Sequence, residues 1–182
     1  MSRVRVYLGC SLDGHIAGPE HNLDFLSEFT PDLHAPAGGL GFTAFLDAIG
    51  VLLMGRRTYQ VLLDHDAWWY GDRTVLVATH HPLPPAPGGG HAVAVSGPIQ
   101  AMIAQAKGAA KGKDVYLDGG DLVRQGFEAG VVDTFCLTVL PLVLGRGIRL
   151  WEGLDGRTDV KFDPPVAYGG SMIQISGHVV KR

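Results

Sequence analysis

Short apolar runs alternate with helix-patterned segments through the first two thirds of this chain. Residues 51–54 and 74–78 are uncharged runs of a length typical of buried strands, whereas 55–63 and 98–110 combine turn residues with helical spacing. Strands that alternate with helices predict a parallel sheet. Residues 172–180 instead alternate with a period of two, as an antiparallel member of a sheet does. We therefore expect an α/β fold whose mostly parallel sheet has an antiparallel C-terminal edge.

Length and charge limit the classes of protein that this chain can be. A chain of 182 residues buries about 70% of its unfolded surface, so we expect a single domain over 1–182 that needs no disulfide. Fifteen Lys and Arg residues against eighteen Asp and Glu, without a block of like charge, give no basic surface for nucleic acid. None of the eight histidines shows H-x-x-x-H spacing, so no metal site is expected.

Two further features predict where the protein resides. Cys10 and Cys136 each lie inside an apolar run, where a thiol acts as a small buried hydrophobe. This usage favours a reducing, cytoplasmic setting. The uncharged stretch 48–54 is far shorter than the roughly 20 residues that a membrane span needs, so no membrane partner is expected.

The run 51–54 leads directly into Gly-Arg-Arg-Thr-Tyr at what is predicted to be a helix start. Two guanidinium groups, a hydroxyl and free helix N–H groups at one strand end suit a phosphate. Adjacent cations such as Arg56 and Arg57 also suit the 2′-phosphate that distinguishes NADPH from NADH. The alternative is a pair of solvated arginines at a helix start, which the pattern alone favours.

A second strand-to-helix turn follows the run 114–117. Gly119 and Gly120 would let a pyrophosphate approach the backbone and lie on the helix N-terminus, with Leu122 on the apolar face of that helix. The segment lacks the full G-x-G-x-x-G spacing, so a simple tight turn explains it equally well. Asp121 would repel a phosphate unless its side chain points away.

Four segments in order resemble a known family. They are Ser-Leu-Asp-Gly-His-Ile-Ala at 11–17, Gly-Arg-Arg-Thr-Tyr at 55–59, Asp-Gly-Gly-Asp-Leu-Val-Arg-Gln at 118–125 and Leu-Pro-Leu-Val-Leu-Gly-Arg-Gly at 140–147. The chain resembles the dihydrofolate-reductase-like family that includes the C-terminal reductase domain of the bifunctional riboflavin-biosynthesis deaminase-reductase. The resemblance implies a three-layer α/β/α fold with an eight-stranded sheet, and NADPH lying across it.

The resemblance also implies residues that hold NADPH. Arg56, Arg57 and Thr58 look like the phosphate clamp, and Gly119 with Gly120 like the pyrophosphate turn. The remaining positions similar to the family's cofactor contacts are Thr79 near the adenosine, Ile16 and Ala17 over the nicotinamide, Leu8 beneath it and Leu122 at the helix start.

The sequence is less informative about the substrate. Hydride transfer needs a proton donor, and the stretch 35–45 holds no carboxylate where dihydrofolate reductases carry one. Asp24 is the candidate acid, and Thr138 matches a family position near the bound heterocycle, although both also suit ordinary structural roles. Trp68, Trp69 and Tyr70 suit either a flat-ring pocket or the core, and the core is favoured.

The leading hypothesis is an NADPH-dependent reductase of a small heterocycle, for which the family's nearest substrate is 5-amino-6-(5-phosphoribosylamino)uracil. The alternatives are a non-catalytic NADP(H)-binding or regulatory module, a side activity on pterin or dihydrofolate, and a protein that binds another phosphorylated ligand at Arg56 and Arg57. Similarity to the family suggests a homodimer, and the uncharged segment 134–144 is expected to form an exposed apolar face.

Overall fold

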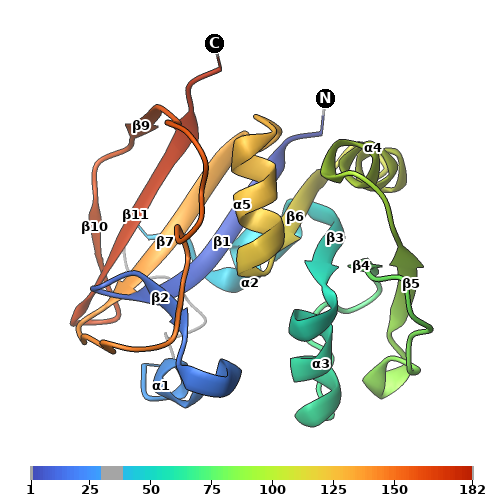
Figure 1. Cartoon of the computed structure of the whole chain (residues 1–182), viewed down its shortest axis with the longest axis horizontal. Coiled ribbons are helices and arrows are strands. Elements are labelled where there is room, and N and C mark those ends of the chain that lie inside the picture. Colours follow the sequence, from blue (N-terminus) through green and yellow to red (C-terminus); the bar gives the residue numbers. More distant parts are fainter. Residues whose placement is uncertain (1, 30–38, 182) are drawn as a thin grey trace.

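The computed structural model describes residues 2–29 and 39–181, which are built around one central sheet (Figure 1). Its strands follow the order β10-β11-β7-β1-β6-β3-β4-β5, and β9 also pairs with β11. The strands of this sheet are β1 (Val4–Ser11), β3 (Ile49–Gly55), β4 (Thr74–Ala78), β5 (His91–Val95), β6 (Asp114–Asp118), β7 (Thr134–Leu140), β9 (Val160–Phe162), β10 (Val166–Tyr168) and β11 (Met172–Val179). A two-stranded sheet joins β2 (His15–Ala17) and β8 (Ile148–Arg149).

Helices connect these strands. The α-helices are α1 (Asp24–Ser27), α2 (Phe42–Asp47), α3 (Arg56–Asp64), α4 (Ile99–Ala109) and α5 (Gly120–Glu128), and short 3-10 turns lie at Pro19–His21 and Pro87–Gly89. In the described residues no helix is long and apolar enough to cross a membrane.

The sheet is mixed, as the sequence predicts. The neighbouring strands from β7 through β1, β6, β3 and β4 to β5 run parallel, whereas β11 runs antiparallel to β7 and pairs Ile173 with Val139. The expected α/β fold with an antiparallel C-terminal edge is therefore confirmed.

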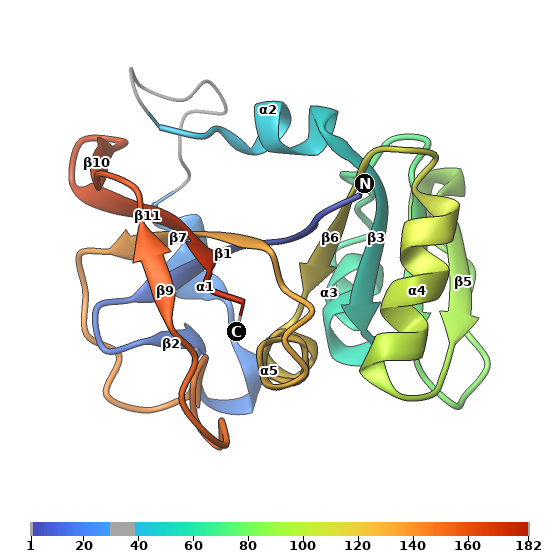
Figure 2. The ribbon, with the colours of Figure 1, turned by 90° about the horizontal axis from the view of Figure 1, so that it is seen from above.

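Helices cover both faces of the parallel strands, and the sequence of β3 shows why. Val51 and Leu53 pack into the core beneath α4 and α5, while Leu52 and Met54 pack into a second core with α2 and α3. All four are almost fully buried, which explains an apolar run without alternation. Figure 2 shows α2 and α5 on opposite sides of the sheet. Truncating Leu53 to Ala would cost about 2–5 kcal/mol of stability, because it leaves a cavity.

The order of the strands creates a crevice at one edge of the sheet. The chain passes from β1 to β3 and outward to β5, and then returns to insert β6 between β1 and β3. Since these strands are parallel, Ser11, Gly55 and Asp118 all lie at carboxyl ends on the same edge. Ligands of open α/β sheets bind where the strand order reverses in this way.

Two expectations from the sequence need correction or qualification. The segment 134–144 does not form an exposed apolar face, because β7 is an interior strand that pairs with both β1 and β11, and Phe135 and Leu140 are buried. The Gly-, Pro- and His-rich composition of 11–41 predicts a long loop with one short helix; the structure shows that helix as α1 but adds the strand β2, and residues 30–38 lie outside the described part of the chain.

Candidate functional site

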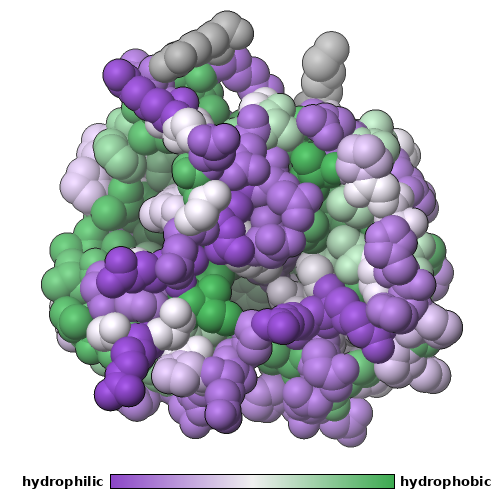
Figure 3. Space-filling view, viewed as in Figure 1, coloured by the Kyte–Doolittle hydropathy of each residue, from purple (hydrophilic) through white to green (hydrophobic). Residues whose placement is uncertain are grey.

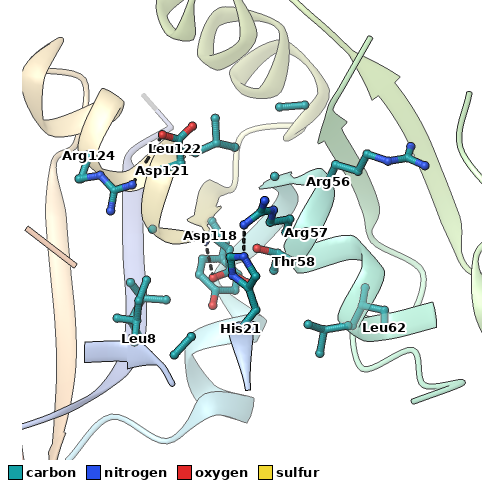
Figure 4. A pocket seen from close by; sticks show the side chains of 18 of the residues that line it. Leu8, His21, Arg56, Arg57, Thr58, Leu62, Asp118, Asp121, Leu122 and Arg124 are labelled. Carbon is teal, nitrogen blue, oxygen red and sulfur yellow. Dashed lines mark hydrogen bonds and ion pairs between the residues drawn. The ribbon is translucent and has the colours of Figure 1, made fainter. Parts of the chain in front are cut away.

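A cavity of about 900 Å³ opens at the carboxyl ends of the parallel strands. Figure 3, in the same view as Figure 1, shows a hollow near the middle of the molecule, with hydrophilic residues around it. The ends of β1, β3 and β6, the first turns of α3 and α5, and the segment around β2 all contribute to the lining. Figure 4 shows the side chains that converge on it.

The first turn of α3 faces the cavity with free backbone donors. β3 ends at Gly55, which has no side chain to cap the helix that begins at Arg56. The first N–H groups of an α-helix have no partner within the helix, so a helix start of this kind attracts anions. The two arginines diverge: Arg56 donates to the carbonyl of Pro82 at 3.1 Å, whereas Arg57 reaches the ring of His21 (Figure 4).

His21 reaches Arg57 from the segment between β2 and α1. Desolvation of the ring and the charge of Arg57 hold the pKa of His21 below its usual range. This favours the neutral ring, whose Nε2 can accept a hydrogen bond from the guanidinium of Arg57. This contact joins two segments that line the same cavity.

The first turn of α5 lies beside that of α3. Gly119 caps α5 with φ 92°, and a Cβ there would lie 2.7 Å from the hydroxyl oxygen of Thr58 and 3.6 Å from the backbone nitrogen of Gly55. Only glycine combines this backbone conformation with so close an approach. The two strand-to-helix turns that the sequence singled out are therefore neighbours, and both helix starts are free of a side-chain cap.

The start of α5 carries charges of both signs. The carboxylate of Asp121 accepts a hydrogen bond from Gln125 at 2.7 Å and lies 3.7 Å from the guanidinium of Arg124. Arg124 in turn donates to the carbonyl oxygens of Arg149 and Leu150. The negative charge of Asp121 thus has its own partners at the rim (Figure 4).

The turn after β1 holds Ile16 and Ala17 in place. The Ser11 hydroxyl donates to Asp13 at 2.7 Å and accepts from the backbone N–H of His15 at 2.9 Å. Asp13 also accepts hydrogen bonds from the backbone N–H groups of Leu144 and Gly145, which tie this turn to the segment after β7, and its carboxylate lies 3.1 Å from Nδ1 of His15. Ile16 is pressed against Gly120, where a Cβ would collide with its side chain.

Aromatic rings form the side of the cavity nearest to α2. The rings of Tyr7 and Phe42 lie 5.6 Å apart, and Tyr116 meets Phe42 edge-on at 6.5 Å. The Tyr7 hydroxyl donates to the carbonyl of Leu40 at 2.9 Å, and the Tyr116 hydroxyl donates to the carbonyl of Tyr7 at 2.8 Å. With both hydroxyls engaged by backbone, these residues contribute mainly their rings to the cavity.

One buried carboxyl group lines this cavity. Asp118 ends β6 and accepts a hydrogen bond from the backbone N–H of Gly119 at 2.8 Å. Burial raises its pKa to about 6, and the hydrogen bond from the Gly119 N–H only partly offsets that effect. Burial and the nearby Asp118 charge raise the pKa of Tyr70. A carboxyl group that titrates near neutral pH in a cleft is typical of acid–base sites.

The structure brings together all of the residues that the family resemblance assigned to NADPH. These residues, which all line this one cavity, are Leu8, Ile16, Ala17, Arg56, Arg57, Thr58, Thr79, Gly119, Gly120 and Leu122.

The two residues expected at the substrate lie elsewhere. Asp24 is exposed and accepts a hydrogen bond from the side chain of Asn22, and it is not among the lining residues. Thr138 is buried within β7, 3.5 Å from the amide of Gln174, and does not line the cavity either. Neither position offers an acid or a hydroxyl to a ligand in this cavity.

Sequence reasoning did not assign roles to several lining residues. Asp118 belongs to the segment 118–125 that resembles the family, and it lines the cavity. The sequence signal that could have identified it is a carboxylate at the end of a buried strand, directly before two glycines. Tyr70 and Trp69 were expected in the core; Tyr70 is buried there, yet both line the cavity, and Trp69 is 53% exposed. No local signal pointed to His21.

Comparisons with known proteins agree with this fold. The chain is 30% identical to the uncharacterized protein YwjB of Bacillus subtilis over 166 residues, which span 90% of this chain and 91% of YwjB. A crystal structure from Shewanella sp. PV-4, of a protein named as a candidate for riboflavin biosynthesis, is 26% identical with a TM-score of 0.84 and covers 98% of this chain and 99% of that one. No family model matches the chain.

More distant structures share the fold at 16% identity. RibD of Acinetobacter baumannii aligns with a TM-score of 0.65 over 99% of this chain and 58% of RibD. Dihydrofolate reductase of Enterococcus faecalis, solved with NADP(H) and RAB-propyl, aligns with a TM-score of 0.59 over 98% of this chain and 97% of the reductase.

Proposed function

Because the chain belongs to the dihydrofolate-reductase-like family, among its RibD-type members, we propose that it is an NADPH-dependent reductase of a small heterocyclic substrate. The observation that carries this proposal is the pair of uncapped helix starts at α3 and α5, which lie side by side on one cavity. Two such starts suit the several phosphate groups of a dinucleotide better than they suit a single anion.

The residues present fit NADPH. Gly119 leaves open the space that a Cβ would occupy beside Thr58, so a phosphate can approach both helix starts. Arg57 would hold the pyrophosphate from α3. Arg56 extends toward the loop after β4, where Thr79 also lines the cavity, and would hold the 2′-phosphate.

The bound dihydronicotinamide would supply a hydride to a C=N or C=O carbon of the substrate. The protein then has to deliver one proton to the adjacent nitrogen or oxygen. We assign that proton to the carboxyl group of Asp118, in place of Asp24, because Asp118 lines the cavity and its pKa of about 6 leaves it partly protonated near neutral pH. Ile16, Leu8 and the aromatic rings would exclude water from this step.

Calorimetric titration with NADPH and with NADH tests the cofactor. We expect NADPH to bind at least tenfold more tightly, because each hydrogen bond to a charged phosphate contributes about 1.5–3 kcal/mol. Absorbance at 340 nm across pterin, pyrimidine and quinone substrates then tests the reaction, with 5-amino-6-(5-phosphoribosylamino)uracil as the first compound. Equal affinity for the two coenzymes would contradict the proposal, and tight NADPH binding without oxidation of NADPH in the presence of any substrate would favour a non-catalytic binding module.

A further inference from the structure

The cations that line the cavity are distributed unevenly. The arginines of the lining are Arg56 and Arg57 at the start of α3 and Arg124 at the start of α5, and no lysine lines the cavity in residues 2–29 and 39–181. Residues 30–38 contain neither lysine nor arginine in their sequence. Positive charge is therefore concentrated at the two helix starts that we assign to the coenzyme.

The side of the cavity toward α2 has the opposite character. Tyr7, Phe42 and Tyr116 present rings there. Leu62 on α3 packs in the same apolar cluster as these rings and also lines the cavity. A phosphate on this side would find no arginine or lysine in the described lining, whereas a flat ring would bury its apolar faces against aromatic side chains.

We infer that the substrate is an uncharged, planar heterocycle that carries no phosphate group, which rests on the proposed function of this site. The inference separates this chain from the activity named for one structural neighbour, a Thermotoga maritima protein whose reductase substrate is a phosphoribosylated aminouracil. The ring lies against Tyr7, Phe42 and Tyr116, on the side of the cavity whose described lining offers no arginine or lysine to an anionic substituent.

A matched pair of ligands tests this inference: 5-amino-6-(ribosylamino)uracil with and without its 5′-phosphate. Binding is measured by calorimetry and by quenching of tryptophan fluorescence, because Trp69 is half exposed and lines the cavity. Each titration is run with the protein alone and with the protein saturated with NADPH, and a Trp69→Phe variant identifies the signal that belongs to this position. We expect the phosphate-free compound to bind at least about tenfold more tightly, which corresponds to 1.4 kcal/mol.

A pair of variants at Val61 tests whether the lack of a cation causes the preference for the phosphate-free compound. Val61 is partly exposed on α3, four residues after Arg57, and lines the cavity. Val61→Lys adds a cation to the lining one helical turn beyond Arg57, and we expect it to reduce the preference for the phosphate-free compound about tenfold. Val61→Met changes size without charge and should keep the preference of the unaltered protein.

Two outcomes would overturn the inference. One is binding of the phosphorylated compound with equal or higher affinity, and the other is NADPH binding accompanied by no binding of either compound. If NADPH fails to bind, the proposed function fails, yet the ratio of the two affinities in the protein alone still decides the inference about the substrate.

Discussion

At the scale of single residues, the two adjacent arginines of α3 have different surroundings. Arg56 is hydrogen-bonded to Pro82 in the loop after β4, and Arg57 contacts His21 near the Gly119 turn. Adjacent positions on a helix point about 100° apart, so neighbouring side chains cannot serve the same phosphate equally. The family resemblance implies that both belong to one clamp, whereas we propose, from these different surroundings, that they hold different parts of the coenzyme.

Replacing each arginine separately tests this division. Arg56→Ala should weaken NADPH binding about 10- to 100-fold while leaving NADH affinity nearly unchanged, because the lost charge-assisted bonds, about 1.5–3 kcal/mol, go to the 2′-phosphate. Arg57→Ala should weaken both coenzymes by a similar factor, because both carry the pyrophosphate. Calorimetry measures both coenzymes on both variants, and each variant is the control for the other. If Arg56→Ala weakens NADPH and NADH by the same factor, as Arg57→Ala should, the assignment is refuted.

Asp118 should also make stability depend on pH. Its folded pKa of about 6 lies above the ordinary value of 3.8, so the folded protein binds the proton more tightly and loses stability as pH rises from about 4 to about 6. The loss is on the order of 3 kcal/mol. Asp118→Asn keeps an acceptor for the Gly119 N–H and should raise the midpoint of thermal unfolding at pH 7.5, with a gain that disappears near pH 4.

The same variant should lose reductase activity, since an amide cannot deliver the proton. Asp121→Asn, at an exposed position on the next helix, is the control and should leave the pH dependence of unfolding unchanged. A stability difference between Asp118→Asn and the unaltered protein that does not vary between pH 4 and 8 would argue against a buried charge at Asp118.

At the scale of elements, the sequence predicts strands and helices well where a local pattern of residues determines them. The run 74–78 became β4 with its predicted bounds, because burial of its central residues on both faces leaves an unbroken apolar segment. Short strands such as β8 and β10 were missed, because two or three residues carry no period and pair only with partners elsewhere in the fold. Gly50, which follows the helical spacing of 42–49, predicts a turn from the sequence but lies inside β3.

The candidate site shows the same contrast between residues that a local motif identifies and residues that only the fold brings together. Residues at the starts of α3 and α5 were predictable because each belongs to a local strand-to-helix motif. The aromatic side was not, because Tyr7, Phe42 and Tyr116 come from three separate elements whose relative position depends on the strand order. Asp24 was a plausible acid from its loop position alone, and only the fold could exclude it from the cavity lining.

Gly119 provides the test of the contact between the two helix starts. Gly119→Ala forces a Cβ toward the Thr58 hydroxyl and a non-glycine residue into φ 92°, and should cost about 1–3 kcal/mol in urea unfolding. Adding Thr58→Ala removes the collision but not the backbone strain, so the double variant should recover only part of the loss. Gly112→Ala, at φ 86° with open space around it, measures the strain alone. Full recovery in the double variant would show that backbone strain is negligible at Gly119.

At the scale of the whole molecule, the cavity lies where the strand order reverses. Its lining therefore comes from segments distant in the sequence, from Leu8 on β1 to Gly97 after β5 and Ile148 at β8. The antiparallel strands β9, β10 and β11 contribute no residue to the described lining. A dinucleotide in this crevice would contact the start of α3, the start of α5 and the segment around β2 at the same time. It would thereby connect elements that follow different strands of the sheet.

Hydrogen exchange with and without NADPH tests that link. Saturation at 100 times the dissociation constant stabilises the folded state by about 2.7 kcal/mol, and the affected amides identify where the coenzyme binds. We expect slower exchange at 16–21, 55–59 and 119–123 together, because one ligand holds the start of α3, the start of α5 and the segment around β2. The amides of β11 that exchange by local opening should be unaffected and serve as the internal control. Protection confined to 55–59 would indicate an isolated phosphate site, and the crevice would then have no role in coenzyme binding.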